Sequence, residues 1–109
     1  MTTSAIWISF DLGVRGNYPA LYTWLDSHLA KECGDSLAFL NYTYDGDLKD
    51  ALKVDLGRCM TPHSPTRVYL IYRDKSSNRN KGVFVFGGRR APAWTGFAQK
   101  DDTGVDEDL

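Results

Sequence analysis

Hydrophobic positions first alternate with polar ones and then change to a helical spacing. Ile6, Ile8 and Phe10 occupy every second position, which is the period of a strand that buries one face. The loop "GVRGN" follows, and Asn17 is a candidate N-cap for a helix with Pro19 in its first turn. The apolar stripe of that helix has these members: Leu21, Trp24, Leu25, His28 and Leu29.

The middle of the chain predicts a hairpin and a second helix. Gly34 and Asp35 mark a tight turn between a short strand, "AKEC", and a longer one, "SLAFLNYTY". Asp47 is a candidate N-cap for the next helix, which "TPHSP" ends. The apolar stripe of this second helix consists of Leu48, Ala51, Leu52, Leu56 and Cys59.

Two further β-rich segments, "RVYLIYR" and "GVFVFGG", form a hairpin around the polar loop "DKSSNRNK". The remainder, "RRAPAWTGFAQ", is irregular or makes one short edge strand, because Pro92 has no N–H to donate. The order is therefore β-α-β-β-α-β with an additional C-terminal strand. We predict an α+β protein with the ferredoxin-like split β-α-β fold, in which two helices cover one face of an antiparallel sheet.

The other face of that sheet is expected to be open. Trp7 and Ser9 are candidates for it, together with one side of the longer hairpin strand, which comprises Ala38, Leu40, Tyr42 and Tyr44. An open face that carries aromatic residues usually meets a partner, and this partner is often a second copy of the chain. We therefore expect a homodimer.

Composition bounds the class of protein. The chain has 109 residues, of which 42% are hydrophobic, so we expect one domain over residues 1–100 and an acidic tail without stable structure over 101–109. The sequence shows neither a membrane span nor a signal peptide, and this favours a cytoplasmic location. Cys33 and Cys59 suit buried free thiols rather than a disulfide framework or a zinc site.

Charge is divided unevenly along the chain, although the net charge is only −1. Residues 66–100 contain eight basic residues against the single acid Asp74, whereas "DDTGVDEDL" at the end carries five acids. Such a basic segment suits an anionic partner, either nucleic acid or an acidic protein surface. The alternative is that Trp94 and Phe97 cap the sheet while the arginines are solvated. The candidate partner-binding residues are Arg73, Lys75, Arg79, Lys81, Arg89, Arg90 and Trp94.

Asp11 closes the first strand in "IWISFDLG" and has two interpretations. It can bind a divalent cation between two subunits, or it can end the strand by accepting hydrogen bonds from the amides of the following loop. We favour the second, because no other His, Asp or Glu lies near it in sequence.

The order of elements is similar to the small CRISPR adaptation nuclease family and to related toxin and antitoxin proteins. The resemblance covers about residues 5 to 87 and is carried by "SFDLG", "SLAFLNYTYDGD" and "RVYLIYR". It implies a homodimer, contact with nucleic acid and, in some members, magnesium-dependent phosphodiester cleavage through paired aspartates, here Asp11. The segment "LGVRGNYPALYTWLDSHLAK" departs from the basic helix usual in that family.

These features favour binding over catalysis, because no recognisable catalytic cluster is present. We expect a small regulatory protein that binds an anionic partner in a bacterial or phage defence, counter-defence or toxin–antitoxin system, with no cofactor. The alternative is a metal-dependent endonuclease that acts on RNA or DNA, with Asp11 as its catalytic residue and magnesium ligand.

Overall fold

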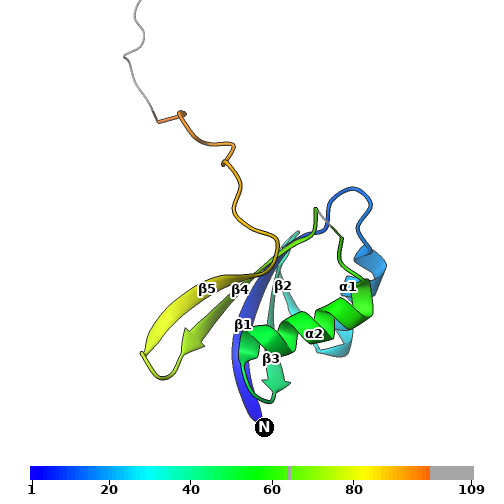
Figure 1. Cartoon of the computed structure of the whole chain (residues 1–109), viewed down its shortest axis with the longest axis vertical. Coiled ribbons are helices and arrows are strands. Elements are labelled where there is room, and N and C mark those ends of the chain that lie inside the picture. The colour runs from blue at the N-terminus through cyan, green and yellow to red at the C-terminus, as the bar shows by residue number, and fades with distance from the viewer. Residues whose placement is uncertain (64, 99–109) are drawn as a thin grey trace, which may run out of the picture.

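The strands of the protein form one antiparallel sheet in the order β2-β3-β1-β4-β5 (Figure 1). The computed structural model describes residues 1–63 and 65–98, and the expected tail over 101–109 lies outside them. The predicted α+β class and order of elements are confirmed. In chain order the elements are β1 (Thr2–Asp11), α1 (Tyr18–Ser27), β2 (Lys31–Gly34), β3 (Leu37–Tyr44), α2 (Leu48–Met60), β4 (Arg67–Asp74) and β5 (Arg79–Phe86).

Both helices begin at the predicted caps. The side chain of Asn17 accepts a hydrogen bond from the backbone N–H of Ala20 at 3.2 Å, and that of Asp47 accepts one from Asp50 at 3.0 Å. Each cap satisfies a backbone donor that the first helical turn leaves without a partner. Within the residues that the structure describes, neither helix is long and apolar enough to cross a membrane.

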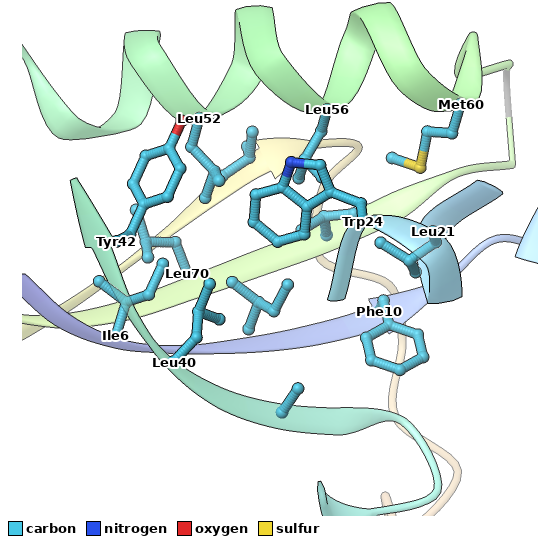
Figure 2. Packing of buried hydrophobic residues seen from close by; sticks show 14 of the residues in the cluster. Ile6, Phe10, Leu21, Trp24, Leu40, Tyr42, Leu52, Leu56, Met60 and Leu70 are labelled. Atoms are coloured by element: carbon cyan, nitrogen blue, oxygen red, sulfur yellow. The ribbon is translucent and has the colours of Figure 1, made fainter. Parts of the chain in front are cut away.

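The core lies between the helices and one face of the sheet (Figure 2). Helix α1 contributes Leu21 and Trp24 to the core, and α2 contributes a buried stripe with Leu52 and Leu56 at its centre. Each strand except β2 also contributes, since the buried sheet residues are Ile6, Ile8, Phe10, Ala38, Leu40, Tyr42, Val68, Leu70 and Val85. Burial of this continuous apolar set fixes which face of the sheet the helices cover.

The opposite face, which we call the open face, carries Trp7 rather than its buried neighbours. The register pairs Trp7 with Phe39 and Ile6 with Leu40, so residues of one pair share a face. The expectation that Ala38, Leu40, Tyr42 and Tyr44 lie on the open face is therefore wrong, because these residues face the core. The other side of β3 lies on the open face. Both sides of β3 are apolar near its middle, and only its partner strand decides between them.

Two boundaries differ from the sequence prediction. Helix α1 ends at Ser27, and Leu29, expected in its apolar stripe, adopts a φ of 56° and is 83% exposed. Strand β5 begins at Arg79 rather than near Gly82. The first residues of β5 pair with β4 through polar side chains, so apolar alternation does not mark this part of the strand.

The two cysteines are both free thiols, as predicted. Cys59 is half-buried in α2, but Cys33 is exposed. The prediction of a buried Cys33 is wrong because β2 is a short edge strand with no buried residue.

Candidate functional site

Asp11 lies at the end of β1, directly opposite Arg67 at the start of β4. One carboxylate oxygen, Oδ1, accepts a hydrogen bond from the backbone N–H of Gly13 at 3.1 Å. The other, Oδ2, accepts from Nη2 of Arg90 at 3.2 Å and from Nη2 of Arg67 at 3.4 Å. The strand-ending interaction with the loop amide is thus present, and two guanidinium groups approach the same side chain.

These contacts stabilise the charged form of Asp11. The hydrogen bond from Gly13 has the largest influence on the pKa of this carboxyl and lowers it. Burial is the second influence and raises the pKa, and Arg67 and Arg90 lower it further, so that it lies below its ordinary value. Asp11 therefore carries its full negative charge at neutral pH. It neutralises only part of the positive charge around it.

The close approach of the segment after β5 depends on Gly87. This residue adopts a φ of 73°, and an added Cβ would lie 2.7 Å from the backbone oxygen of Thr66. A side chain at this position would therefore require both an unfavourable backbone conformation and displacement of a neighbour. Gly87 allows the chain to pass beside the start of β4, where Arg90 can reach Asp11.

Arg89 completes the group and lies over two aromatic rings. Its guanidinium carbon is 5.9 Å from the ring centroid of Tyr69 and 5.8 Å from that of Phe84, within the range of cation–π attraction. The rings pack edge to face with centroids 4.8 Å apart. The Tyr69 ring covers Gly82, where a Cβ would overlap its hydroxyl. We call Arg67, Arg89 and Arg90 the arginine cluster.

Two hollows meet at the arginine cluster. The first, of about 280 Å³, includes Ser9, Asp11 and Tyr69 in its lining. The second, of about 760 Å³, lies between Arg90 and Trp94. Trp94 is 75% exposed and Phe97 is 85% exposed, so neither caps the sheet. The interpretation in which these two side chains cover the sheet is wrong.

The other predicted binding residues gather at the opposite end of the β4–β5 hairpin. We call Arg73, Lys75, Arg79 and Lys81 the hairpin-tip group. Because β4 and β5 have eight residues each, a strand length of roughly 25 Å separates this group from the arginine cluster. The surface predicted as one unit therefore consists of two.

Two residues of the hairpin-tip group form hydrogen bonds and an ion pair within the hairpin. Arg73 donates hydrogen bonds to Asn78 at 2.7 Å and Asn80 at 3.3 Å, and Lys81 forms an ion pair with Asp74 at 2.8 Å. These contacts order the turn and use the donors of two of the four cations. Arg73 and Lys81 thus have a structural role in the turn.

Between the two basic groups the open face is apolar. Trp7 packs against Phe39 with ring centroids 5.0 Å apart, and Ile71 is the residue opposite Trp7 on β4. Trp7 remains 38% exposed. A path across the sheet from the arginine cluster therefore passes Ser9 and reaches an exposed indole ring.

The surroundings of Asp11 do not fit a magnesium ion. Within residues 1–63 and 65–98, no three His, Cys, Asp or Glu side chains gather into a group that could hold a metal. Magnesium prefers oxygen ligands, whereas the nearest charged neighbours of Asp11 are two guanidinium groups. These cations would repel a metal ion at Asp11.

Sequence reasoning missed Arg67, Tyr69 and Phe84 as site residues. Alternation within "RVYLIYR" places Arg67, Tyr69 and Ile71 on one side of the strand, which was a usable signal. What the sequence lacked was the register that sets Arg67 opposite Asp11.

Comparison of the chain with protein-family models, curated proteins and solved structures found no match. The resemblance to the CRISPR adaptation nuclease family stays a prediction from the sequence. The site is accordingly interpreted from its own geometry.

Proposed function

We propose that the protein binds single-stranded nucleic acid at the arginine cluster and along the adjacent open face. The observation that carries this proposal is the convergence of the guanidinium groups of Arg67 and Arg90 on one carboxylate. The guanidinium group of Arg89 lies over two neighbouring rings, and the exposed Trp94 lies beside the cluster. Asp11 and Arg67 lie on the sheet face opposite the helices, since they follow and precede the buried core residues Phe10 and Val68 on their strands. The charge and the shape of the site both suit an extended anionic chain.

Each part of the site matches one part of a nucleotide. Guanidinium groups pair with phosphate oxygens through two parallel N–H donors, which gives them an advantage over lysine. Exposed rings stack on bases, and every base offers a face, so such binding tolerates different sequences. Trp94 beside the arginine cluster and Trp7 across the sheet are the rings available for stacking.

The aromatic rings favour nucleic acid over an acidic protein as the partner. An acidic protein surface would use the arginines and the indole as interface anchors, whereas a nucleic acid also supplies planar bases that stack on the indole. Sheet aromatics that stack bases are a common mode of single-stranded RNA recognition. We therefore place phosphates at the arginine cluster and bases on the neighbouring rings.

The proposal includes a ferredoxin-like split β-α-β arrangement with β5 added at its edge. Support comes from the strand order, in which β1 lies between β3 and β4, and β3 separates β1 from β2. A homodimer is also proposed, and this rests on the sequence resemblance. Because Trp7 is assigned to the bound strand, its patch is not proposed as the dimer interface. The role as a cytoplasmic regulator in a defence or toxin–antitoxin system rests on the sequence resemblance.

Titration with a short fluorescein-labelled oligouridine tests the proposal. We expect binding whose log affinity falls with log salt at a slope of about −2, because three phosphate contacts to a single strand each contribute roughly 0.7. Polyglutamate of similar length is the control, and it should bind more weakly because it cannot stack. Absence of oligonucleotide binding at low salt would overturn the proposal, and preferential binding of polyglutamate would assign an acidic protein partner instead.

A further inference from the structure

Asp11 lies where an anion bound by two arginines would lie. We infer that, in the free protein, its carboxylate engages the donors of Arg67 and Arg90 that a phosphate group of the bound strand would otherwise take, and that it thereby lowers the affinity of the site. This inference rests on the proposed function and concerns regulation of the same surface.

The two ion pairs are loose enough to exchange. Their N–O distances of 3.2 and 3.4 Å exceed the 2.7–2.9 Å that is typical of a strong charge-assisted hydrogen bond. The side chains of Asp11 and Arg90 are 47% and 65% exposed. Exposed ion pairs of this kind contribute little, so a phosphate can replace the carboxylate without a large loss.

The guanidinium groups also have donors to spare. Each uses a single nitrogen, Nη2, on Asp11. Within the described residues, the Nε atom of Arg67 is buried without a hydrogen-bond partner. A phosphate offers several oxygens and can engage both guanidinium groups at once, whereas Asp11 presents only Oδ2 to them.

The carboxylate of Asp11 cannot move together with the Arg90 side chain when that side chain binds a phosphate. Gly13 holds Oδ1 of Asp11 at the end of β1, which belongs to the centre of the sheet. Arg90 lies on the segment after Gly87 and Gly88, where the chain is not part of the sheet. Arg90 therefore moves to the phosphate while the charge of Asp11 stays beside it and opposes binding.

Asp11→Asn tests this inference with little risk to the fold. Asparagine keeps an oxygen that can accept the hydrogen bond from Gly13 but removes the negative charge. We expect this variant to bind the labelled oligouridine roughly three- to tenfold more tightly at low salt, which is the effect of deleting one charge near a phosphate in a solvent-exposed site. The gain should shrink as salt increases.

Asp26→Asn is the matched control, because it removes the same charge from an exposed position on α1. It should leave the affinity within about twofold of the wild type, because α1 packs on the sheet face opposite the arginine cluster. In an Arg90→Gln background, Asp11→Asn should give a smaller gain than in the wild type.

The outcomes separate this inference from the proposed function. If the wild type binds and Asp11→Asn binds no more tightly than Asp26→Asn, Asp11 does not compete with the phosphate and the inference is wrong. If both the wild type and Asp11→Asn fail to bind while circular dichroism shows folded protein, the proposed function itself fails. Cleavage of the probe with magnesium that is lost in Asp11→Asn would overturn the inference in favour of the nuclease alternative.

Discussion

Asp55 and Asp11 each accept hydrogen bonds from two side chains of other elements. Asp55 lies on the side of the sheet that the helices cover, whereas Asp11 lies on the open face. Asp55 accepts hydrogen bonds from Nε1 of Trp24 and from the hydroxyl of Tyr42, both at 3.1 Å. Asp11 accepts from two guanidinium groups at longer distances. The partners of Asp55 are neutral and buried in the core, whereas those of Asp11 are charged and partly exposed.

The difference separates a structural carboxylate from an exchangeable one. The Asp55 contacts join α2, α1 and β3, and Figure 2 shows the Tyr42 hydroxyl directed toward α2. Burial, with the charge of Asp55 as the second cause, raises the pKa of Tyr42 above its ordinary value and keeps its proton on the oxygen that donates. No comparable enclosure surrounds Asp11.

The largest effect on stability is expected from Leu56→Ala. Leu56 is fully buried in α2, so the truncation removes apolar contacts and leaves a cavity, at a cost of about 2–5 kcal/mol in the free energy of unfolding. Val54→Ala on the same helix, where the side chain is 53% exposed, is the control and should cost far less. Urea unfolding measures both. Equal losses would contradict the placement of α2 on the sheet.

Asp55→Ala should come next. It leaves the indole N–H of Trp24 and the hydroxyl of Tyr42 without their acceptor, which costs about 1–3 kcal/mol. Asp26→Asn serves as the exposed control and should change the free energy of unfolding by less than about 0.5 kcal/mol. A fully stable Asp55→Ala protein would show that the network between the helices and β3 is dispensable.

Trp7→Ala should weaken the binding of oligouridine but change the free energy of unfolding little. Removal of a stacked base contact costs about 1–3 kcal/mol of binding free energy, equivalent to a five- to 150-fold weaker affinity for oligouridine. Polyglutamate binding should not change, because it needs no ring. Light scattering on the wild type tests the proposed homodimer: a mass equal to the 12.2 kDa of a single chain would contradict it.

Acidification should produce the smallest effect. Contacts with Lys81, Ser77 and Ser76 lower the pKa of Asp74 well below its ordinary value, and the pKa of Asp11 is lowered as well. A carboxyl whose folded-state pKa is depressed contributes stability above its unfolded pKa, near 3.8, and loses it as the pH falls through the folded value. Stability should therefore decline below about pH 4, and Asp74→Asn should decline less than the wild type. An identical decline would show that this hairpin contact contributes nothing.

The fold was more accessible from the sequence than the site. Local signals such as the caps at Asn17 and Asp47 and the apolar stripe of α2 predicted the elements, because each depends on neighbouring residues only. The exposed face of β3 was assigned wrongly because both of its sides are apolar, and only the pairing of Trp7 with Phe39 settles it.

The site depends on residues that are distant along the chain. Asp11, Arg67 and Arg90 meet because β1 pairs with β4 and the chain passes close at Gly87. The count of positive charges marked residues 66–100 as a basic segment but could not divide it between the two ends of a hairpin. Arg67 was missed for that reason.

The most direct measurement compares the two basic groups by matched double variants. Arg89→Ala with Arg90→Ala removes two charges from the arginine cluster, and Lys75→Ala with Arg79→Ala removes two from the hairpin tip. Oligouridine titrations over a range of salt should show at least tenfold weaker binding for the first variant, with a slope reduced by about 1.4, and nearly wild-type behaviour for the second. Equal losses in both variants, or a larger loss at the tip, would contradict the assignment of the binding site to the arginine cluster.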